Sequence, residues 1–162
     1  LIRFIKQEID DGRFGEIQYA SLVAREGVPK IAASAWIESG SHILDTARFL
    51  FSGQTKHKIF CWVDSPIITH LNDDVARGQL ASGILDIGGP KGFCTYIHVN
   101  CCNVGEYDYR IMIQGSKRSE YWQVPCDADM HLREMQSFLE GQQGLATLED
   151  GIANVRLLAA GL

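Results

Sequence analysis

The segment from Ser34 to Phe51 has two opposed faces, and this pattern constrains the fold more than any other stretch of the chain. Its apolar residues recur at the 3.6-residue period of an α-helix: Ile43, Leu44, Ala47, Leu50 and Phe51. Such a stripe must face a hydrophobic core. The sequence therefore predicts a helix over about residues 37–51 that packs on another layer of structure.

Three polar side chains occupy the other face of this predicted helix. Glu38, His42 and Asp45 are spaced at i, i+4 and i+7, which stacks them on one side and points them away from the apolar stripe. One interpretation is a solvated helix face. Another is a proton-handling site, in which a carboxylate orients an imidazole that accepts a proton from a substrate. A third is a metal hydrolase that uses Glu38, His42 and His131.

Helix and strand patterns alternate along the rest of the chain. A short helix is predicted over 2–11, ending at Gly12, and a strand over 16–25 follows it. Five more strands are predicted after Gly53, over 58–63, 79–87, 93–102, 107–113 and 120–124. The turns between them contain glycine.

Two helices are predicted to close the chain, over 127–140 and 148–161. The second begins with a capping box of Thr147 and Asp150 and has apolar residues on the side predicted to face the sheet: Ile152, Val155, Leu158 and Ala159. The predicted fold class is α+β, a mostly antiparallel open-faced sheet with helices packed on one face, in a single domain over 1–162.

Composition excludes several classes of function. Of the 162 residues, 46% are hydrophobic and 22% charged, which is typical of a globular domain, and no apolar run approaches a membrane-spanning helix. The net charge is −5 and the basic residues are scattered, with Lys117 and Arg118 adjacent in an expected solvated turn. Neither nucleic acid nor a membrane is therefore an expected partner. Five cysteines without Cys-x-x-Cys spacing fit neither a zinc site nor a disulfide framework, so we expect free thiols and a reducing cytoplasm.

Three ordered motifs resemble those of one enzyme family. Gly40, His42 and Asp45 match the Asp-x-Gly-x-His-x-x-Asp helix in the C-terminal domain of the Gfo/Idh/MocA family of NAD(P)-dependent oxidoreductases. Residues 8–17 resemble the entry of that domain into its first strand, and 138–141 with 147–151 resemble its closing pair of helices.

The resemblance implies the substrate-binding and oligomerisation part of an oxidoreductase that acts on a sugar, a cyclitol or a related hydroxy compound. It implies NAD or NADP as the cofactor of the full-length enzyme, and an N-terminal nucleotide-binding Rossmann domain as a partner. No Gly-x-Gly-x-x-Gly opens a helix in this chain. We therefore expect this domain alone to bind no cofactor and to be inactive without that partner.

The same resemblance implies roles for the polar helix face. His42 would exchange the proton of the substrate hydroxyl, Glu38 would orient His42 or bind a neighbouring hydroxyl, and Asp45 would support the helix at the substrate site. Glu38 stands where the family has aspartate, and Ser34 and Ala35 stand where it has two glycines. Because a misplacement on the order of 1 Å affects catalysis strongly, the exact substrate does not transfer from the family.

Three further residues near this helix are candidates for substrate binding. Trp36 either stacks on an apolar sugar face or anchors the core. Arg25 and Lys30 border the loop before the helix and either meet an anionic or hydroxylated substrate or remain solvated.

The open face of the sheet is the expected homo-oligomer interface, because sheets of two subunits pack face to face in the resembled family. Its outward residues would include Tyr96, His98, Tyr107, Tyr109 and Tyr121. The alternative is a sheet exposed to water. A different class of function also fits the chain: a noncatalytic assembly or ligand-binding module that retains the fold.

Overall fold

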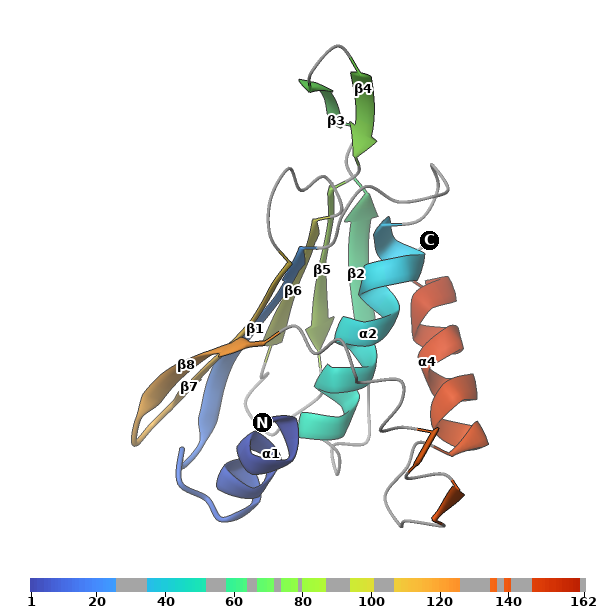
Figure 1. The fold of residues 1–162 in the computed structure, drawn as a ribbon. Coiled ribbons are helices and arrows are strands. Elements are labelled where there is room, and N and C mark those ends of the chain that lie inside the picture. Colours follow the sequence, from blue (N-terminus) through green and yellow to red (C-terminus); the bar gives the residue numbers. More distant parts are fainter. Residues whose placement is uncertain are drawn as a thin grey trace.

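The computed structural model describes residues 1–25, 35–51, 58–63, 67–71, 74–78, 80–86, 94–100, 107–125, 135–136, 139–140 and 147–160, with side chains in 1–25, 39–51, 107–125, 135–136, 139–140 and 147–160. The helices are α1 (Ile2–Asp10), α2 (Ala35–Leu50) and α4 (Leu148–Ala160). The strands are β1 (Ile17–Arg25), β2 (Lys58–Val63), β3 (Ile67–Leu71), β4 (Asp74–Gly78), β5 (Leu80–Asp86), β6 (Cys94–Asn100), β7 (Asp108–Gly115) and β8 (Ser119–Val124). The chain is α+β, as predicted (Figure 1).

Within this described part of the chain, six strands form one sheet in the order β2-β5-β6-β1-β7-β8. Neighbouring strands are antiparallel except β1 and β6, which run parallel with Tyr19 opposite Cys94. The strands predicted for this sheet are confirmed to within two residues at each end.

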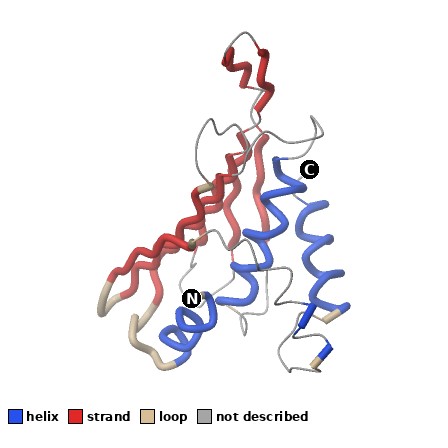
Figure 2. The backbone as a smooth tube through the Cα atoms, viewed as in Figure 1, coloured by secondary structure: helices blue, strands red, loops and turns tan. Residues whose placement is uncertain are grey.

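A second, two-stranded sheet is formed by β3 and β4, and the sequence analysis does not predict it. Figure 2 shows this hairpin projecting beyond the end of the larger sheet. Leu71 pairs with Asp74 at the closed end of this hairpin. Strands of five residues contain too few alternations to stand out, and the Asn-Asp pair is the turn signal that was available.

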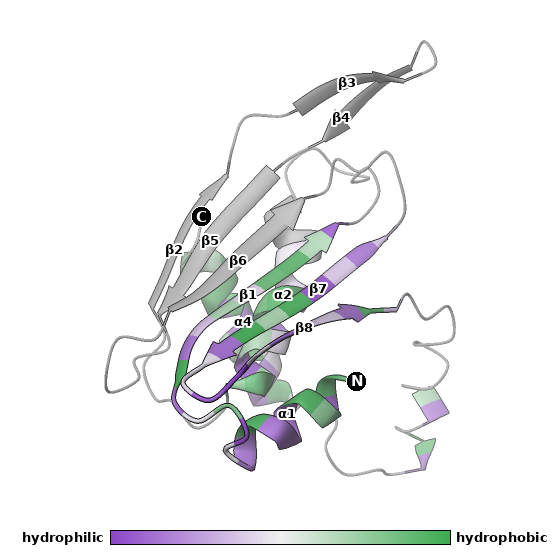
Figure 3. Ribbon diagram, turned by 90° about the vertical axis from the view of Figure 1, so that its left-hand side faces the viewer, coloured by the Kyte–Doolittle hydropathy of each residue, from purple (hydrophilic) through white to green (hydrophobic). Residues whose placement is uncertain are grey.

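The hydrophobic core lies between α2 and the sheet. Helix α2 contacts β1, β5 and β6, while α4 contacts α2 and β2, and α1 contacts α2. Figure 3 looks at the sheet with α2 and α4 behind it. The largest fully buried side chains come from α1, the turn after it, β1, α2 and β7: Ile5, Phe14, Leu22, Ile43, Leu44, Leu50, Ile111 and Ile113. Burial of each stabilises the fold by about 1.5–3 kcal/mol before the entropy of ordering is subtracted.

Two glycines allow the chain to turn from α1 into β1. Gly12 and Gly15 have φ angles of 68° and 71°, which L side chains rarely adopt. A Cβ on Gly15 would lie 2.4 Å from the hydroxyl oxygen of Ser116, which accepts a hydrogen bond from the backbone N–H of Glu16 at 3.0 Å. Glycine at position 15 therefore lets the turn between β7 and β8 close on the start of β1.

The predicted buried face of α4 is wrong in most of its residues. Ile152 is 44% exposed, Val155 is 64% exposed and Ala159 is also exposed. Leu158 packs partly against the core, as predicted, and Leu157 does so as well. In this rotation about the helix axis, Asp150 and Asn154 of α4 form hydrogen bonds with α2.

The prediction for Tyr109 on the open sheet face is also wrong. Tyr109 is 6% exposed, and its hydroxyl donates a hydrogen bond to Oγ1 of Thr46 on α2 at 2.8 Å. Strand alternation places it on the same face as Ile111 and Ile113, which is the core face. Tyr121 is exposed, as expected. Tyr107 is also exposed, but its ring stacks on that of Tyr109 with the centroids 6.5 Å apart, so it lies beside Tyr109 and not on the open face. The side chains of Tyr96 and His98 on β6 lie outside the described residues.

The prediction of a solvated turn holds for Lys117 but is wrong for Arg118. Its guanidinium donates a hydrogen bond to Glu8 Oε2 at 2.5 Å and lies 4.5 Å from the ring centroid of Phe14. A cation stacked on an aromatic ring and paired with a carboxylate stays attached to the fold. Arg118 therefore ties the turn between β7 and β8 to α1.

Candidate functional site

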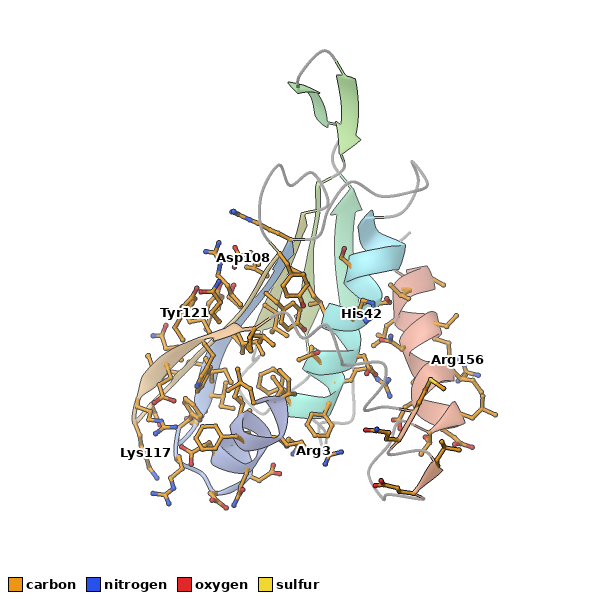
Figure 4. The ribbon with its side chains drawn as sticks, in the orientation of Figure 1. Arg3, His42, Asp108, Lys117, Tyr121 and Arg156 are labelled. Carbon is orange, nitrogen blue, oxygen red and sulfur yellow. The ribbon has the colours of Figure 1, made fainter. Side chains whose placement is uncertain are left out.

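The outward face of α2 carries the central candidate, His42. Ile43, Leu44, Ala47 and Leu50 are fully buried, which fixes the rotation of the helix about its axis. His42 and Asp45 are exposed on the opposite side, and Figure 4 shows His42 projecting from α2 away from the sheet. This confirms the predicted orientation of the helix. The catalytic role of His42 stays a prediction.

Polar contacts hold both flanks of α2. On one flank, the hydroxyl of Thr46 accepts the hydrogen bond from Tyr109 of β7. On the other, Nδ2 of Asn154 on α4 donates to the carbonyl oxygen of Ser41 at 3.0 Å. A helix that is packed and hydrogen-bonded on both flanks has a well-defined position. His42 therefore projects from a rigid element.

Arg48 links Asp45 to α4. Its Nη1 donates to the backbone carbonyl of Asp150 at 2.6 Å, its Nη2 lies 3.3 Å from Asp150 Oδ1, and Nη1 lies 3.7 Å from Asp45 Oδ1. The side chain of Arg48 is only 14% exposed, whereas that of Asp45 is 52% exposed. Asp45 thus has a structural contact, and its place at the substrate site stays a prediction.

Asp150 completes the capping box of α4, in which Thr147 is the N-cap, and is also the partner of Arg48. The pKa of Asp150 is lowered by hydrogen bonds from Thr147, chiefly from its backbone N–H and also from its hydroxyl. Burial opposes this effect, whereas the positive charge of Arg48 adds to it. The predicted capping box is confirmed, with the Asp150 N–H donating to Thr147 Oγ1 at 3.2 Å. The sequence analysis missed Arg48; the signal was its position three residues after Asp45, in the last turn of α2.

The structure does not bring Arg25 together with His42. Ala20, Leu22 and Ala24 of β1 face the core, so alternation sets Arg25 on the other face of the sheet. There its Nε lies 3.8 Å from Asp108 Oδ2.

The remaining candidates for substrate and catalysis are described only in part. Trp36 and Glu38 lie within the first turn of α2, but their side chains lie outside the described residues. Lys30 lies outside them altogether. The roles of all three stay predictions.

Alternative sites from the sequence gain no support. Gly83 lies inside β5 with Cys61 and Ile97 as its strand partners, so it does not belong to a phosphate-binding loop. His131 and Glu134 lie outside the described residues. Among the side chains that are described, no three from His, Cys, Asp and Glu gather closely enough to hold a metal ion. None of the described helices has the length and apolarity needed to cross a bilayer.

Comparison with known proteins establishes the fold. No model of a protein family matches the sequence, and no curated protein matches it. Solved structures do match: a myo-inositol dehydrogenase from Corynebacterium glutamicum has a TM-score of 0.70 at 17% identity, over 99% of this chain and 57% of that one. The scyllo-inositol dehydrogenase from Lactobacillus casei, solved with NAD(H) and scyllo-inositol, has a TM-score of 0.67 at 16% identity, over 98% of this chain and 57% of that one.

The WlbA dehydrogenase from Bordetella pertussis, solved with NADH and UDP-GlcNAcA, has a TM-score of 0.61 at 18% identity, over 98% of this chain and 56% of that one. The chain thus spans little more than half the length of these enzymes. At such low identity the likeness concerns the fold alone, and this fold is the one found in part of several NAD-linked dehydrogenases of cyclitols and sugars.

Proposed function

We propose that residues 1–162 form the substrate-binding C-terminal domain of an NAD(P)-dependent oxidoreductase of the Gfo/Idh/MocA type. The substrate class is a cyclitol, a sugar or a related hydroxy compound. The observation that carries this proposal is the orientation of α2, which buries its apolar stripe and exposes His42 within a fold shared with inositol dehydrogenases.

In this proposal the residues of α2 handle the proton of the substrate. His42 accepts the proton of the hydroxyl at the carbon being oxidised, as a general base. Glu38, one turn earlier on the same face, orients His42 or binds a neighbouring hydroxyl. Arg48 and Asp150 hold the distal half of α2 in place, so that the position of His42 does not depend on the substrate.

The cofactor belongs to a second domain in this proposal. NAD or NADP supplies the hydride acceptor when bound. Gly83 is part of a paired strand rather than of a strand-to-helix phosphate loop, which supports this assignment of the cofactor. The proposed partner on the N-terminal side is therefore the nucleotide-binding domain.

The test uses the full-length protein that contains both domains. We expect it to bind NAD or NADP, measured by fluorescence of the reduced form, and to reduce it with at least one compound from a panel of inositols and sugars. His42→Ala should lower turnover by roughly 10²–10⁴ while leaving cofactor binding in place.

Lys117→Ala is the matched control for His42→Ala, because Lys117 is exposed in the turn between β7 and β8 at a distance from α2 (Figure 4). It should keep wild-type turnover. Unchanged turnover in His42→Ala would remove His42 from the mechanism. A full-length protein that binds neither NAD nor NADP would favour the noncatalytic module instead.

We also propose that the uncovered face of the sheet joins two copies of the chain. Tyr121 is 55% exposed on this face, opposite Met112 and two residues from Gln123, the strand partner of Arg110. Tyrosine, methionine and arginine are enriched at protein interfaces, which supports this surface over an open sheet in water.

A further inference from the structure

Helix α2 is held in different ways on its two flanks. On one flank α4 lies alongside it, and two polar contacts join the helices, one made by Asn154 and one by Arg48. The other flank looks toward β7 and β8 (Figure 1). The hydrogen bond described there runs from the hydroxyl of Tyr109 to Oγ1 of Thr46, at 2.8 Å.

His42 lies close to the flank that Tyr109 holds. At 3.6 residues per turn, a residue four positions after His42 points within about 40° of it, so Thr46 lies one turn further along nearly the same face. Ser41 and Arg48, the residues of α2 that are bonded to α4, are rotated from His42 by about 100° and 120°. The bond from Tyr109 therefore fixes the part of the helix surface that carries His42.

Tyr109 has a well-defined position of its own. It is 6% exposed on the core face of β7, and the ring of Tyr107 stacks on its ring with the centroids 6.5 Å apart and the planes at 19°. A buried hydroxyl needs a hydrogen-bond partner, and Thr46 supplies one. Tyr109 reaches α2 from β7, which lies beyond the strands that the helix contacts most, β1, β5 and β6. It thus ties α2 to a further strand of the sheet.

From this arrangement we infer that Tyr109 is a positioning residue, which acts on His42 through Thr46. The buried stripe of α2 is apolar, and apolar contacts are non-directional, so they oppose a small rotation of the helix about its axis only weakly. A hydrogen bond has a preferred length and angle, and one on the flank of His42 opposes that rotation directly. The inference rests on the proposed function where it concerns turnover, because a general base displaced by on the order of 1 Å loses much of its rate.

The test removes the Tyr109 hydroxyl and keeps its ring. In the full-length protein, Tyr109→Phe should lower kcat at least fivefold with the best substrate of the inositol panel. KM for that substrate and the dissociation constant for NADH should stay within twofold of wild type, since neither ligand is bound by Tyr109. In the chain of 162 residues alone, the imidazole signal of His42 in a carbon–proton correlation spectrum should move by more than its linewidth. His42→Ala assigns this signal by its disappearance.

The matched control is Asn154→Ala, which removes one hydrogen bond from the other flank of α2. The contacts of Arg48 with Asp150 still join the two helices in this variant. We therefore expect Asn154→Ala to keep kcat within twofold of wild type and to leave the His42 signal in place, even where its melting temperature falls as far as that of Tyr109→Phe.

Substitutions of Thr46 test the same bond from its other end. Thr46→Val removes the acceptor with little change of shape, so it should lower kcat and move the His42 signal as Tyr109→Phe does. Thr46→Ser keeps the hydroxyl and should retain kcat within twofold of wild type. The double variant of Tyr109→Phe with Thr46→Val should be no slower than the slower single variant, because both changes break one contact. If Tyr109→Phe fails to fold, the two Thr46 variants still test the inference.

Two results would overturn the inference. An unmoved His42 signal in both Tyr109→Phe and Thr46→Val would show that the bond does not position His42. An equal loss of kcat in Asn154→Ala and Tyr109→Phe would reduce the bond to a contribution to overall stability. Absence of both NADH binding and turnover in the wild-type full-length protein would instead reject the proposed function, and the spectra of the 162-residue chain would still decide whether Tyr109 positions His42.

Discussion

Asp108 shows how one carboxylate is kept charged on the sheet face that points away from α2. It is 8% exposed, and Nε of Arg110 donates a hydrogen bond to its Oδ1 at 2.6 Å, with a second one from Nη2 to Oδ2. The hydrogen bonds from Arg110 lower the pKa of Asp108 and outweigh the opposing effect of burial, and the charges of Arg110 and Arg25 act in the same direction. The same contact raises the pKa of Arg110.

This lowered pKa predicts a pH dependence of stability. A group whose pKa is lower in the folded state stabilises the fold above its unfolded pKa of about 3.9, and this contribution is lost as the pH falls through the folded value. Asp108→Asn should therefore be less stable than wild type at pH 7. The difference in free energy of unfolding should shrink as the pH falls below about 4, measured by urea denaturation at both pH values.

Asp10→Asn serves as the control for this prediction. The Asp10 side chain is 56% exposed and pairs with Lys6 at the surface, so its loss should cost less than about 1 kcal/mol. An Asp108→Asn defect of equal size at pH 7 and pH 3 would contradict the assignment of the low pKa to the Arg110 contact.

At the scale of elements, the sequence predicts α2 well and α4 only in part. Helix α2 has aliphatic residues on one side and Glu38, His42 and Asp45 on the other, so only one face can be buried. Helix α4 has aliphatic residues on both sides, Leu157 and Leu158 inward and Ile152 and Val155 outward. Periodicity alone cannot choose between two apolar faces; the contacts of Asp150 and Asn154 with α2 do so.

The pairing of strands is another feature that periodicity cannot supply. The parallel pair of β1 and β6 joins segments that are remote in the sequence, with Leu22 opposite Ile97. Alternation indicates that each segment is a strand, but it carries no information on which strand lies beside it. The candidate site also combines a local and a tertiary feature. The periodicity of α2 predicts the orientation of His42, whereas the contact of Arg48 with Asp150 of α4 depends on tertiary packing, which periodicity does not predict.

The capping box gives a prediction for α4 as an element. Thr147 Oγ1 donates to Asp150 Oδ2 at 2.8 Å, and the backbone N–H of Thr147 donates to the same oxygen at 2.9 Å. Thr147→Ala removes the hydroxyl and leaves the Asp150 N–H without its acceptor, so it should lower the free energy of unfolding by about 1 kcal/mol. Urea denaturation measures this loss, and the dependence of the free energy of unfolding on urea concentration should keep its wild-type slope.

Thr147→Ser is the matched control, because serine keeps the hydroxyl that both caps the helix and contacts Asp150. It should retain most of the wild-type stability. If serine and alanine cost the same, the lost methyl group rather than the cap would explain the defect.

For the whole molecule, the helix layer and the sheet present different surfaces. The far face of the sheet carries charged and polar residues beside aromatic ones, among them Arg25, Arg110, Gln123 and Tyr121. In Figure 4, Asp108 and Tyr121 lie on the opposite side of the molecule from Arg156 of α4. The helix layer and the far face of the sheet therefore point in different directions.

The proposed sheet-to-sheet assembly gives the last prediction. Tyr121→Lys removes an exposed aromatic ring and places a second positive charge beside Arg110, so each copy would bring like charges into a shared interface. Loss of a central tyrosine costs about 2 kcal/mol or more at many interfaces, which corresponds to roughly thirtyfold weaker association. Sedimentation velocity over a range of concentrations should show an oligomer for wild type and for Ala160→Lys, which carries the same added charge on α4. Tyr121→Lys should shift toward monomer while its circular dichroism spectrum stays that of the folded chain. A wild-type chain that remains monomeric at tens of micromolar, or a Tyr121→Lys variant that assembles like Ala160→Lys, would mean that this face of the sheet is not the interface between copies.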